Sequence, residues 1–265
     1  MHTTDRFDAV SEIVFGGGTL LGVWAHPDDE SYLAGGLMAR ASAAGGRSVA
    51  AFATRGEAGT DDPTRWPPAV LARRRELELR RALDRLGAEG PTFLGHADGG
   101  CAAIDVEWGA AQVASLIDEV EPDVIVTFGR DGVTGHDDHR AVSEWTIAAW
   151  QAVRRRRHRV PHLLLAAVTP EFVLRHQRWH TEIGFFGADG PMTTDPADLT
   201  LRVVLDDAEL DRKVASLAAH ASQTRPLVEL LGADTYREWW RTETFRVARE
   251  ARTERRPVDG DRLTA

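Results

Sequence analysis

The chain has 265 residues, 43% of them hydrophobic, and a formal net charge of −9 at pH 7. This length is sufficient for one α/β domain with a buried core. No Pro-, Gly- or Ser-rich stretch divides the sequence, so we expect a single domain over residues 1–265. Surfaces that bind nucleic acid or anionic membranes need clustered positive charge, and the acidic balance of this chain argues against both partners.

Cys101 is the only cysteine, so no intrachain disulfide can form and an oxidising compartment is not implied. Residues 1–11 contain acids and lack the apolar core of a signal peptide. No segment approaches the roughly 20 apolar residues that a membrane-spanning helix needs. From these three features we expect a cytoplasmic protein.

Predicted strands and helices alternate along the chain, as a parallel sheet requires. The order predicts an α/β fold, a Rossmann-like three-layer αβα arrangement around a mostly parallel sheet. We place the folded core at about residues 17–248 and expect the charged tail at about residues 249–265 to be disordered. The expected strands cover residues 19–24, 48–53, 92–94, 124–128 and 163–168, and the expected helices cover residues 32–44, 73–86, 110–119, 139–153, 206–220 and 236–247.

Clusters of polar residues directly follow two of these strands. Residues 25–30 (AHPDDE) come after the strand at 19–24, and residues 135–139 (GHDDH) come after the strand at 124–128. In open α/β sheets ligands bind at the carboxyl ends of the parallel strands. Histidines and carboxylates delivered to one edge therefore predict a metal site at the C-terminal edge of the strands.

The residue types in these clusters fit hydrolytic metal chemistry. Catalytic zinc commonly takes three nitrogen or oxygen ligands and leaves the fourth position to water, and His26, Asp29 and His139 would supply such a set. Two histidines and one carboxylate also suit Fe(II) or Co(II). Asp28 then remains beside the metal as a candidate general base. If a helix begins at the second cluster, His136 faces the same way as His139 and would stabilise an oxyanion or protonate a leaving amine.

Two other interpretations of the glycine and acidic residues are weaker. The AHPDDE segment alone also fits an ordinary helix start, where acidic residues suit the N-cap and the first turn. That interpretation does not explain the second cluster. The glycines at 16–18 precede their strand, whereas those of a dinucleotide-binding fingerprint follow it, so nucleotide binding is not predicted.

The two clusters resemble the motifs of the LmbE-like, or PIG-L-like, family of zinc-dependent N-deacetylases. The first motif, A-H-P-D-D-E, is complete. The second, usually H-P-D-H, is present at residues 136–139 with Asp137 in place of proline, and both residue types suit the first turn of a helix. The resemblance implies zinc on His26, Asp29 and His139, with Asp28 as base, His136 as electrostatic or acid group, and Asp138 as a carboxylate supporting the ligands.

Shorter matches extend the resemblance over most of the chain. Residues 55–57 resemble the family's G-E loop, residues 73–77 its R-x-x-E-L segment, and residues 93–99 a loop with an aspartate near the sugar. Residues 213–223 match a K-to-H-x-S-Q helix pattern, and residues 243–245 match an E-x-F pattern. By this resemblance the residues expected to contact the substrate are Glu57, Arg73, Asp98 and His220.

The resemblance predicts an enzyme, a zinc-dependent hydrolase that removes the acetyl group from an N-acetylated amino sugar such as N-acetylglucosamine in a small glycoside. Family members in thiol-cofactor biosynthesis carry a tyrosine two residues before the first histidine of the second motif. This chain has Thr134 there, which argues against a close assignment to that branch. The alternatives are an amidase that cleaves a mycothiol-type thiol conjugate and, from a different class, an inactive carbohydrate-binding relative.

A small-molecule N-acetylated sugar is the only partner that the sequence predicts, and a homo-oligomer is compatible with it. The group attached to the sugar is not specified. The loops that would contact it, residues 56–68 and 181–196, are the least patterned parts of the chain.

Overall fold

The computed structural model describes residues 10–183, 186 and 192–248, so the tail expected to be disordered lies outside the described residues. Its centre is a seven-stranded sheet with the order β3-β2-β1-β4-β5-β7-β6. The first five strands in this order pair in parallel, and β7 pairs antiparallel with both β5 and β6. This confirms the mostly parallel α/β sheet. The strands are β1 (Thr19–Trp24), β2 (Arg47–Phe52), β3 (Glu89–Phe93), β4 (Val124–Thr127), β5 (His162–Ala166), β6 (Leu201–Val204) and β7 (Thr242–Val247).

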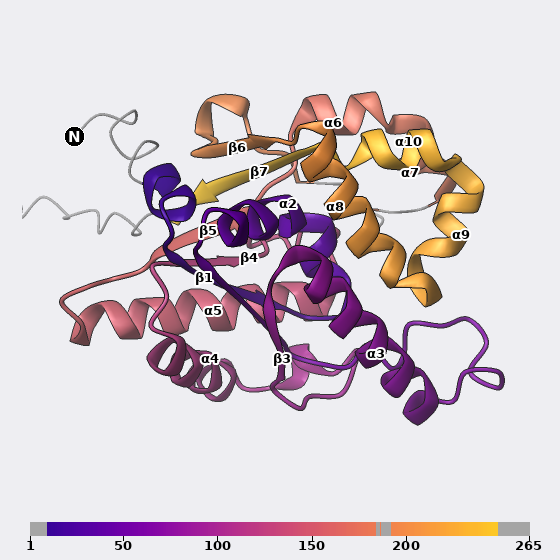
Figure 1. Cartoon of the computed structure of the whole chain (residues 1–265). Helices are drawn as coiled ribbons and strands as arrows, with labels where there is room; N and C mark the ends of the chain where they lie inside the picture. Colours follow the sequence, from indigo (N-terminus) through magenta and orange to yellow (C-terminus); the bar gives the residue numbers. More distant parts are fainter. Residues whose placement is uncertain (1–9, 184–185, 187–191, 249–265) are drawn as a thin grey trace, which may run out of the picture.

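Helices cover both faces of the sheet, as Figure 1 shows. The central strands β1, β4 and β5 are buried almost throughout, which agrees with their continuous apolar sequences. α4 and α5 lie together against one face, and α2, α3 and α8 pack on the other. The bounds of these helices are α2 (Asp29–Ala43), α3 (Pro68–Leu86), α4 (Val106–Val120), α5 (Asp137–Arg156) and α8 (Asp207–Ala219).

The C-terminal part of the chain departs from the predicted elements. The helix expected at residues 236–247 is wrong, because only α10 (Ala233–Trp239) is helical and β7 follows it. The β7 sequence, TETFRV, alternates more and less buried residues and carries β-branched side chains, both of which favour a strand. The prediction also missed four elements of this region, β6 and the helices α6 (Pro170–Arg175), α7 (Gln177–Ile183) and α9 (Ala221–Leu231).

A buried ion pair from this C-terminal part inserts into helix α2. The Glu243 carboxylate accepts hydrogen bonds from the backbone N–H groups of Gly36 and Leu37, at 2.7 and 2.8 Å. Lys213 Nζ donates to the Tyr32 carbonyl at 2.8 Å and to Glu243 at 2.7 Å. In an uninterrupted helix the Gly36 N–H would donate to the Tyr32 carbonyl. The pair therefore fixes α2 within about the first two turns after its start. The candidate site lies at that start.

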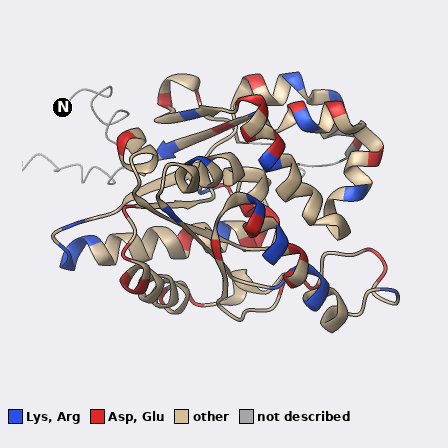
Figure 2. Cartoon of the chain, viewed as in Figure 1, with Lys and Arg blue, Asp and Glu red and all other residues tan. Residues whose placement is uncertain are grey.

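Lys and Arg residues are interspersed with Asp and Glu residues along the chain, as Figure 2 shows. The basic run at residues 154–157 forms the end of α5, where Arg156 and Arg157 both pair with Asp118 at 2.6 Å. This run is therefore partly neutralised. Among the described residues, no helix combines the length and the apolar composition needed to cross a membrane.

Candidate metal centre and active site

The three predicted metal ligands come together at the carboxyl ends of the adjacent parallel strands β1 and β4. His26 follows β1, Asp29 lies in the first turn of α2, and His139 lies in the first turn of α5. His26 Nδ1 lies 3.2 Å from His139 Nε2, which lies 3.3 Å from Asp29 Oδ1, and His26 Nδ1 lies 3.6 Å from Asp29 Oδ2. All three residues are buried.

The far side of each imidazole is held by hydrogen-bond acceptors. His139 Nδ1 lies 3.0 Å from the Gly132 carbonyl, to which it donates, so its Nε2 presents a lone pair to the centre. His26 Nε2 lies 3.0 Å from Asp98 Oδ1 and 3.2 Å from Asp138 Oδ2. Donation to these carboxylates directs a lone pair on His26 Nδ1 at the same centre. Supporting partners of this kind are typical of histidines that bind metals.

Two imidazole nitrogens and a carboxylate aimed at one point repel each other unless a cation lies between them. Ligand atoms at about 2.0–2.1 Å from a tetrahedral zinc ion are about 3.3 Å apart, close to the separations found here. Burial lowers the pKa of His26, but hydrogen bonds to Asp138 and Asp98 outweigh it and raise this pKa to about 10. A proton on His26 and a metal ion are thus alternatives at this point, and the donor set fits a divalent metal.

Asp98 and Glu57, both expected to contact substrate, join two loops behind His26. The backbone N–H of Asp98 donates to Glu57 Oε1 at 3.0 Å, and Ala58 N donates to Asp98 Oδ2 at 2.8 Å. Asp138 accepts from the N–H groups of Gly99 and Cys101 at 2.7 and 2.9 Å. Burial alone would raise the pKa of Asp138, but its hydrogen bonds, first among them that from His26, lower it to about 2. An ionised Asp138 therefore orients His26 and ties α5 to this loop.

The candidate base Asp28 has an unusual backbone conformation, with φ of 111°. Its N–H donates to Glu30 Oε2 at 2.9 Å, and its carboxylate lies 3.3 Å from Nη2 of Arg75. A non-glycine residue in this region is strained and needs support from its surroundings. Burial raises the pKa of the Asp28 carboxyl to about 6, while Arg75 acts in the opposite direction.

Arg75 was not among the predicted site residues. It is buried, and it also donates to the carbonyls of Gly56 and Pro27 at 2.7 and 2.6 Å. Arg73, which was expected to contact substrate, is exposed on another side of α3. The sequence contains two overlapping R-x-x-E-L matches, at residues 73–77 and 75–79. Only the second places its arginine on the buried side of α3, with Leu71 four residues before it and Leu79 four after.

His220, also expected to contact substrate, lies behind the first turn of α2. Its Nε2 is 2.8 Å from Glu30 Oε1, and both side chains are fully buried. The same carboxylate accepts from the Ser31 hydroxyl at 2.6 Å. His220 therefore supports Glu30, which in turn holds the backbone of Asp28.

His136 caps the N-terminus of α5 at the exposed side of the site. Its ring centre lies 4.9 Å from that of His26 and 5.0 Å from that of His139. Nδ1 accepts from the N–H of Asp138 at 3.1 Å, so in the neutral ring Nε2 carries the proton and is available as a donor. The position suits a group that contacts a reacting carbonyl.

A pocket opens beside the three predicted metal ligands, and two of them, Asp29 and His139, form part of its wall. Tyr32, Phe172 and Trp240 form an aromatic side of this pocket. Sequence reasoning missed these aromatic residues. Phe172 and Trp240 come from α6 and from the end of α10, where no motif marks them, so only the fold reveals that they line the site.

Comparisons with known proteins agree with the arrangement of these residues. The family model described as PIG-L, GlcNAc-PI de-N-acetylase, matches residues 21–150, which contain both clusters. A 1D-myo-inositol 2-acetamido-2-deoxy-alpha-D-glucopyranoside deacetylase from Kineococcus radiotolerans is 34% identical over 84% of this chain and 72% of that protein.

Solved structures share the fold. A conserved protein from Thermus thermophilus has a TM-score of 0.60 and 25% identity, covering 87% of this chain and 94% of that one. An N,N'-diacetylchitobiose deacetylase from Pyrococcus horikoshii also has a TM-score of 0.60, with 18% identity over 92% of this chain and 91% of that one. The likeness to the second shows the fold alone, whereas the family match and the curated relative show descent: this chain belongs to the PIG-L, or LmbE-like, family.

Proposed function

We propose that this protein is a zinc-dependent N-deacetylase that hydrolyses the acetamide of an N-acetylglucosamine glycoside to acetate and a free amine. The observation that carries the proposal is the convergence of His26, Asp29 and His139 on one point, with Asp28 and His136 beside them. The curated relative is named as the deacetylase of an inositol glycoside of this sugar, which supports the reaction class.

His26, Asp29 and His139 would hold a divalent metal, which would supply a Lewis acid able to lower the pKa of water and polarise the amide carbonyl. Asp28 accepts a proton from the attacking water at its carboxylate, and a pKa of about 6 leaves it ionised at neutral pH. Arg75 and the Glu30 carboxylate hold Asp28 in place.

His136 acts on the carbonyl oxygen. The Nε2–H group of His136 donates a hydrogen bond to this oxygen as negative charge develops on it. The C–N bond then breaks, and the proton taken up by Asp28 passes to the departing amine nitrogen. Acetate and the amino sugar leave, and Asp28 is ionised again.

The alternatives are less well supported. Cleavage of a thiol conjugate is not favoured, because the curated relatives are named as deacetylases. An inactive binding protein would not require Asp28 in a strained backbone conformation beside a complete set of ligand candidates.

The test is an assay of zinc-loaded protein with the inositol and methyl glycosides of N-acetylglucosamine, in which free amine and acetate are measured together. Equal amounts of both products are expected. Asp28→Asn should keep its metal and lose roughly 10²–10⁴-fold in rate, the range for a missing general base. Asp137→Asn, in the exposed first turn of α5, is the matched control and should retain activity. Absence of amine from both glycosides, or full activity of Asp28→Asn, would overturn the proposal.

A further inference from the structure

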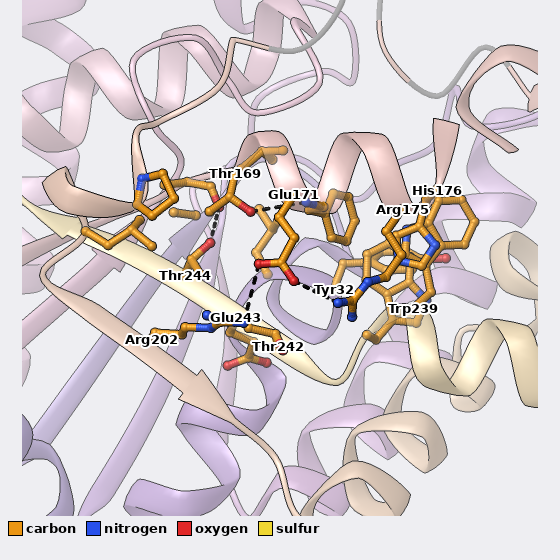
Figure 3. Close-up of a pocket in the computed structure, with 18 of the residues that line it drawn as sticks. Tyr32, Thr169, Glu171, Arg175, His176, Arg202, Trp239, Thr242, Glu243 and Thr244 are labelled. Atoms are coloured by element: carbon orange, nitrogen blue, oxygen red, sulfur yellow. Dashed lines mark hydrogen bonds and ion pairs between the residues drawn. The ribbon is translucent and has the colours of Figure 1, made fainter. Parts of the chain in front are cut away.

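A second cavity lies beside the metal centre, between α6, the end of β5 and the start of β7 (Figure 3). We call it the aromatic pocket. It shares Tyr32, Leu33, Val168, Phe172 and Trp240 with the pocket next to Asp29 and His139, so these residues form its side nearest the metal centre. The two cavities are therefore neighbours along the same edge of the sheet.

The aromatic rings of this pocket are packed against one another. Trp239 stacks on Trp240, with ring centres 5.3 Å apart and an interplanar angle of 11°, and His176 stacks on Trp239 at 5.0 Å. The ring centres of Tyr32 and Trp240 are 4.7 Å apart. Ring faces that already pack together are not free to stack on a sugar ring. Aliphatic residues, among them Ala167, Val168 and Leu199, add to the apolar lining of the pocket.

Three of the polar side chains that line the aromatic pocket, those of Thr169, Glu243 and Thr244, already have partners. The Thr244 hydroxyl donates to the Ala167 carbonyl at 2.6 Å, and the Thr169 hydroxyl accepts from the N–H of Phe172 at 3.2 Å. Glu243 is occupied by Lys213 and by helix α2. A polyhydroxylated ligand such as inositol would lose hydrogen bonds to water here without gaining an equal number from the protein.

Apart from the buried Lys213–Glu243 pair, the charged side chains that line the pocket lie at its rim, where opposite charges pair. Glu171 lies 2.7 Å from Arg175 and 3.7 Å from Arg202. Their side chains are more than half exposed, from 52% to 64%. Figure 3 shows the Glu171–Arg175 pair along α6, above the strand that carries Thr242 and Thr244. These charges do not provide a buried site for an ionic ligand.

We propose that the aromatic pocket is an aglycone subsite, which binds an apolar aryl or alkyl group attached to the amino sugar being deacetylated. This inference rests on the proposed function and adds the substrate class. Burial of one phenyl-sized group should raise kcat/KM roughly tenfold to a hundredfold. The chain should therefore prefer an apolar glycoside to the inositol glycoside of its curated relatives.

The first experiment compares kcat/KM of the zinc-loaded protein for the methyl, inositol, phenyl and octyl glycosides of N-acetylglucosamine, each with the same anomeric configuration. We expect the phenyl or the octyl glycoside to exceed both the methyl and the inositol glycosides by at least about tenfold. The order of phenyl and octyl distinguishes an aryl from an alkyl ligand. An inositol glycoside that equals or exceeds both would overturn the inference.

The second experiment fills the pocket. Ala167 lines the aromatic pocket but not the pocket next to Asp29 and His139. Ala167→Phe should therefore reduce the ratio of kcat/KM for the phenyl glycoside to kcat/KM for the methyl glycoside towards one. Ala114→Phe, at a partly buried alanine on α4, is the matched control and should keep the wild-type ratio. If Ala167→Phe does not fold, Leu199→Glu places a charge on the same apolar surface and should have the same effect. An unchanged ratio in a folded variant would contradict the subsite.

Binding distinguishes failure of the subsite from failure of the proposed function. Phenyl glucoside lacks the acetamide, so its binding, followed by tryptophan fluorescence, does not depend on catalysis. Saturable binding that Ala167→Phe weakens supports the pocket even if no glycoside is deacetylated, and only the proposed function then fails. Deacetylation of all glycosides at similar rates, with no binding of phenyl glucoside, would instead keep the function and remove the subsite.

Discussion

The part of the molecule up to β5 and the part after it contribute to the site in different ways. The first part carries every candidate metal ligand, at the ends of the parallel strands β1 and β4. The second part, residues 170–247, supplies the pocket aromatics Phe172 and Trp240 and the buried ion pair Lys213–Glu243, which holds α2. In the proposed function the first part would supply the chemistry. The second part lines the pocket beside the candidate ligands and holds helix α2.

The largest expected effect tests the first part. His139→Ala should lose most of its bound metal and roughly 10³-fold or more in rate, because several kcal/mol of transition-state stabilisation depend on the metal. Metal analysis and amine release measure both effects. His158→Ala, at an exposed histidine beyond α5, is the control and should keep both. Full metal occupancy in His139→Ala would show that His139 is not a metal ligand, and that the two sequence clusters do not form one metal site with His26 and Asp29.

His136→Ala tests chemistry within the same part without removing the metal. A donor that acts only on the developing oxyanion lowers kcat when it is removed and leaves KM nearly unchanged, with losses of roughly 10²–10³-fold. The metal content should stay at the wild-type level, because His136 is not one of the three central ligands. If KM rises while kcat is retained, His136 binds the sugar, and the oxyanion must be stabilised by other groups.

The contrast between the two parts also explains how much could be predicted from sequence. His26, Asp29 and His139 follow continuous apolar strands, so their motifs and their place in the sheet were predictable together. The strand β7 was mistaken for a helix because its neighbours Tyr236–Trp239 continue a helical pattern, and its pairing with β5 depends on contacts distant in sequence. Phe172 and Trp240 carry no local signal, since they lie at the site only because α6 and α10 pack there.

Arg75 shows an intermediate case. The R-x-x-E-L pattern occurs twice, two residues apart, and only the burial phase of α3 shows which of the two arginines is buried. Val133, with φ of 66°, shows a feature that sequence does not reveal at all. A β-branched residue is rarely found in this conformation, yet here it belongs to the turn that brings the Gly132 carbonyl to His139.

The Lys213–Glu243 ion pair, which we call the brace on α2, links the two parts, and its removal should have a smaller effect. Lys213→Met should lower the free energy of unfolding by about 3–5 kcal/mol, because it leaves Glu243 charged and buried without its cation. Urea unfolding measures this change. Arg40→Met, in the more exposed Arg40–Glu209 pair, is the control and should cost less than about 1 kcal/mol.

A double variant distinguishes a simple ion pair from one inserted in a helix. Replacing both partners of an ordinary buried pair by apolar residues often restores stability. Glu243 also accepts two N–H groups of α2, which lose this charged acceptor in Lys213→Met with Glu243→Leu. This double variant should therefore stay destabilised, by about 1–3 kcal/mol. Recovery to the wild-type level would mean that α2 does not need the brace and that the two parts of the molecule are independent.

The smallest expected effect comes from substitutions of two arginines on α3, Arg75 and Arg73. Arg75→Gln should destabilise the fold by about 1–3 kcal/mol, because the Gly56 and Pro27 carbonyls lose a buried charged donor. It should also lower kcat more than metal content, since Arg75 contacts Asp28 and none of the three central ligands. Arg73→Gln, two residues away and exposed, should change stability by less than about 0.5 kcal/mol. Equal effects of the two substitutions would show that the charge of α3 matters and its contact with Asp28 does not, whereas unequal effects would identify the arginine that positions the base.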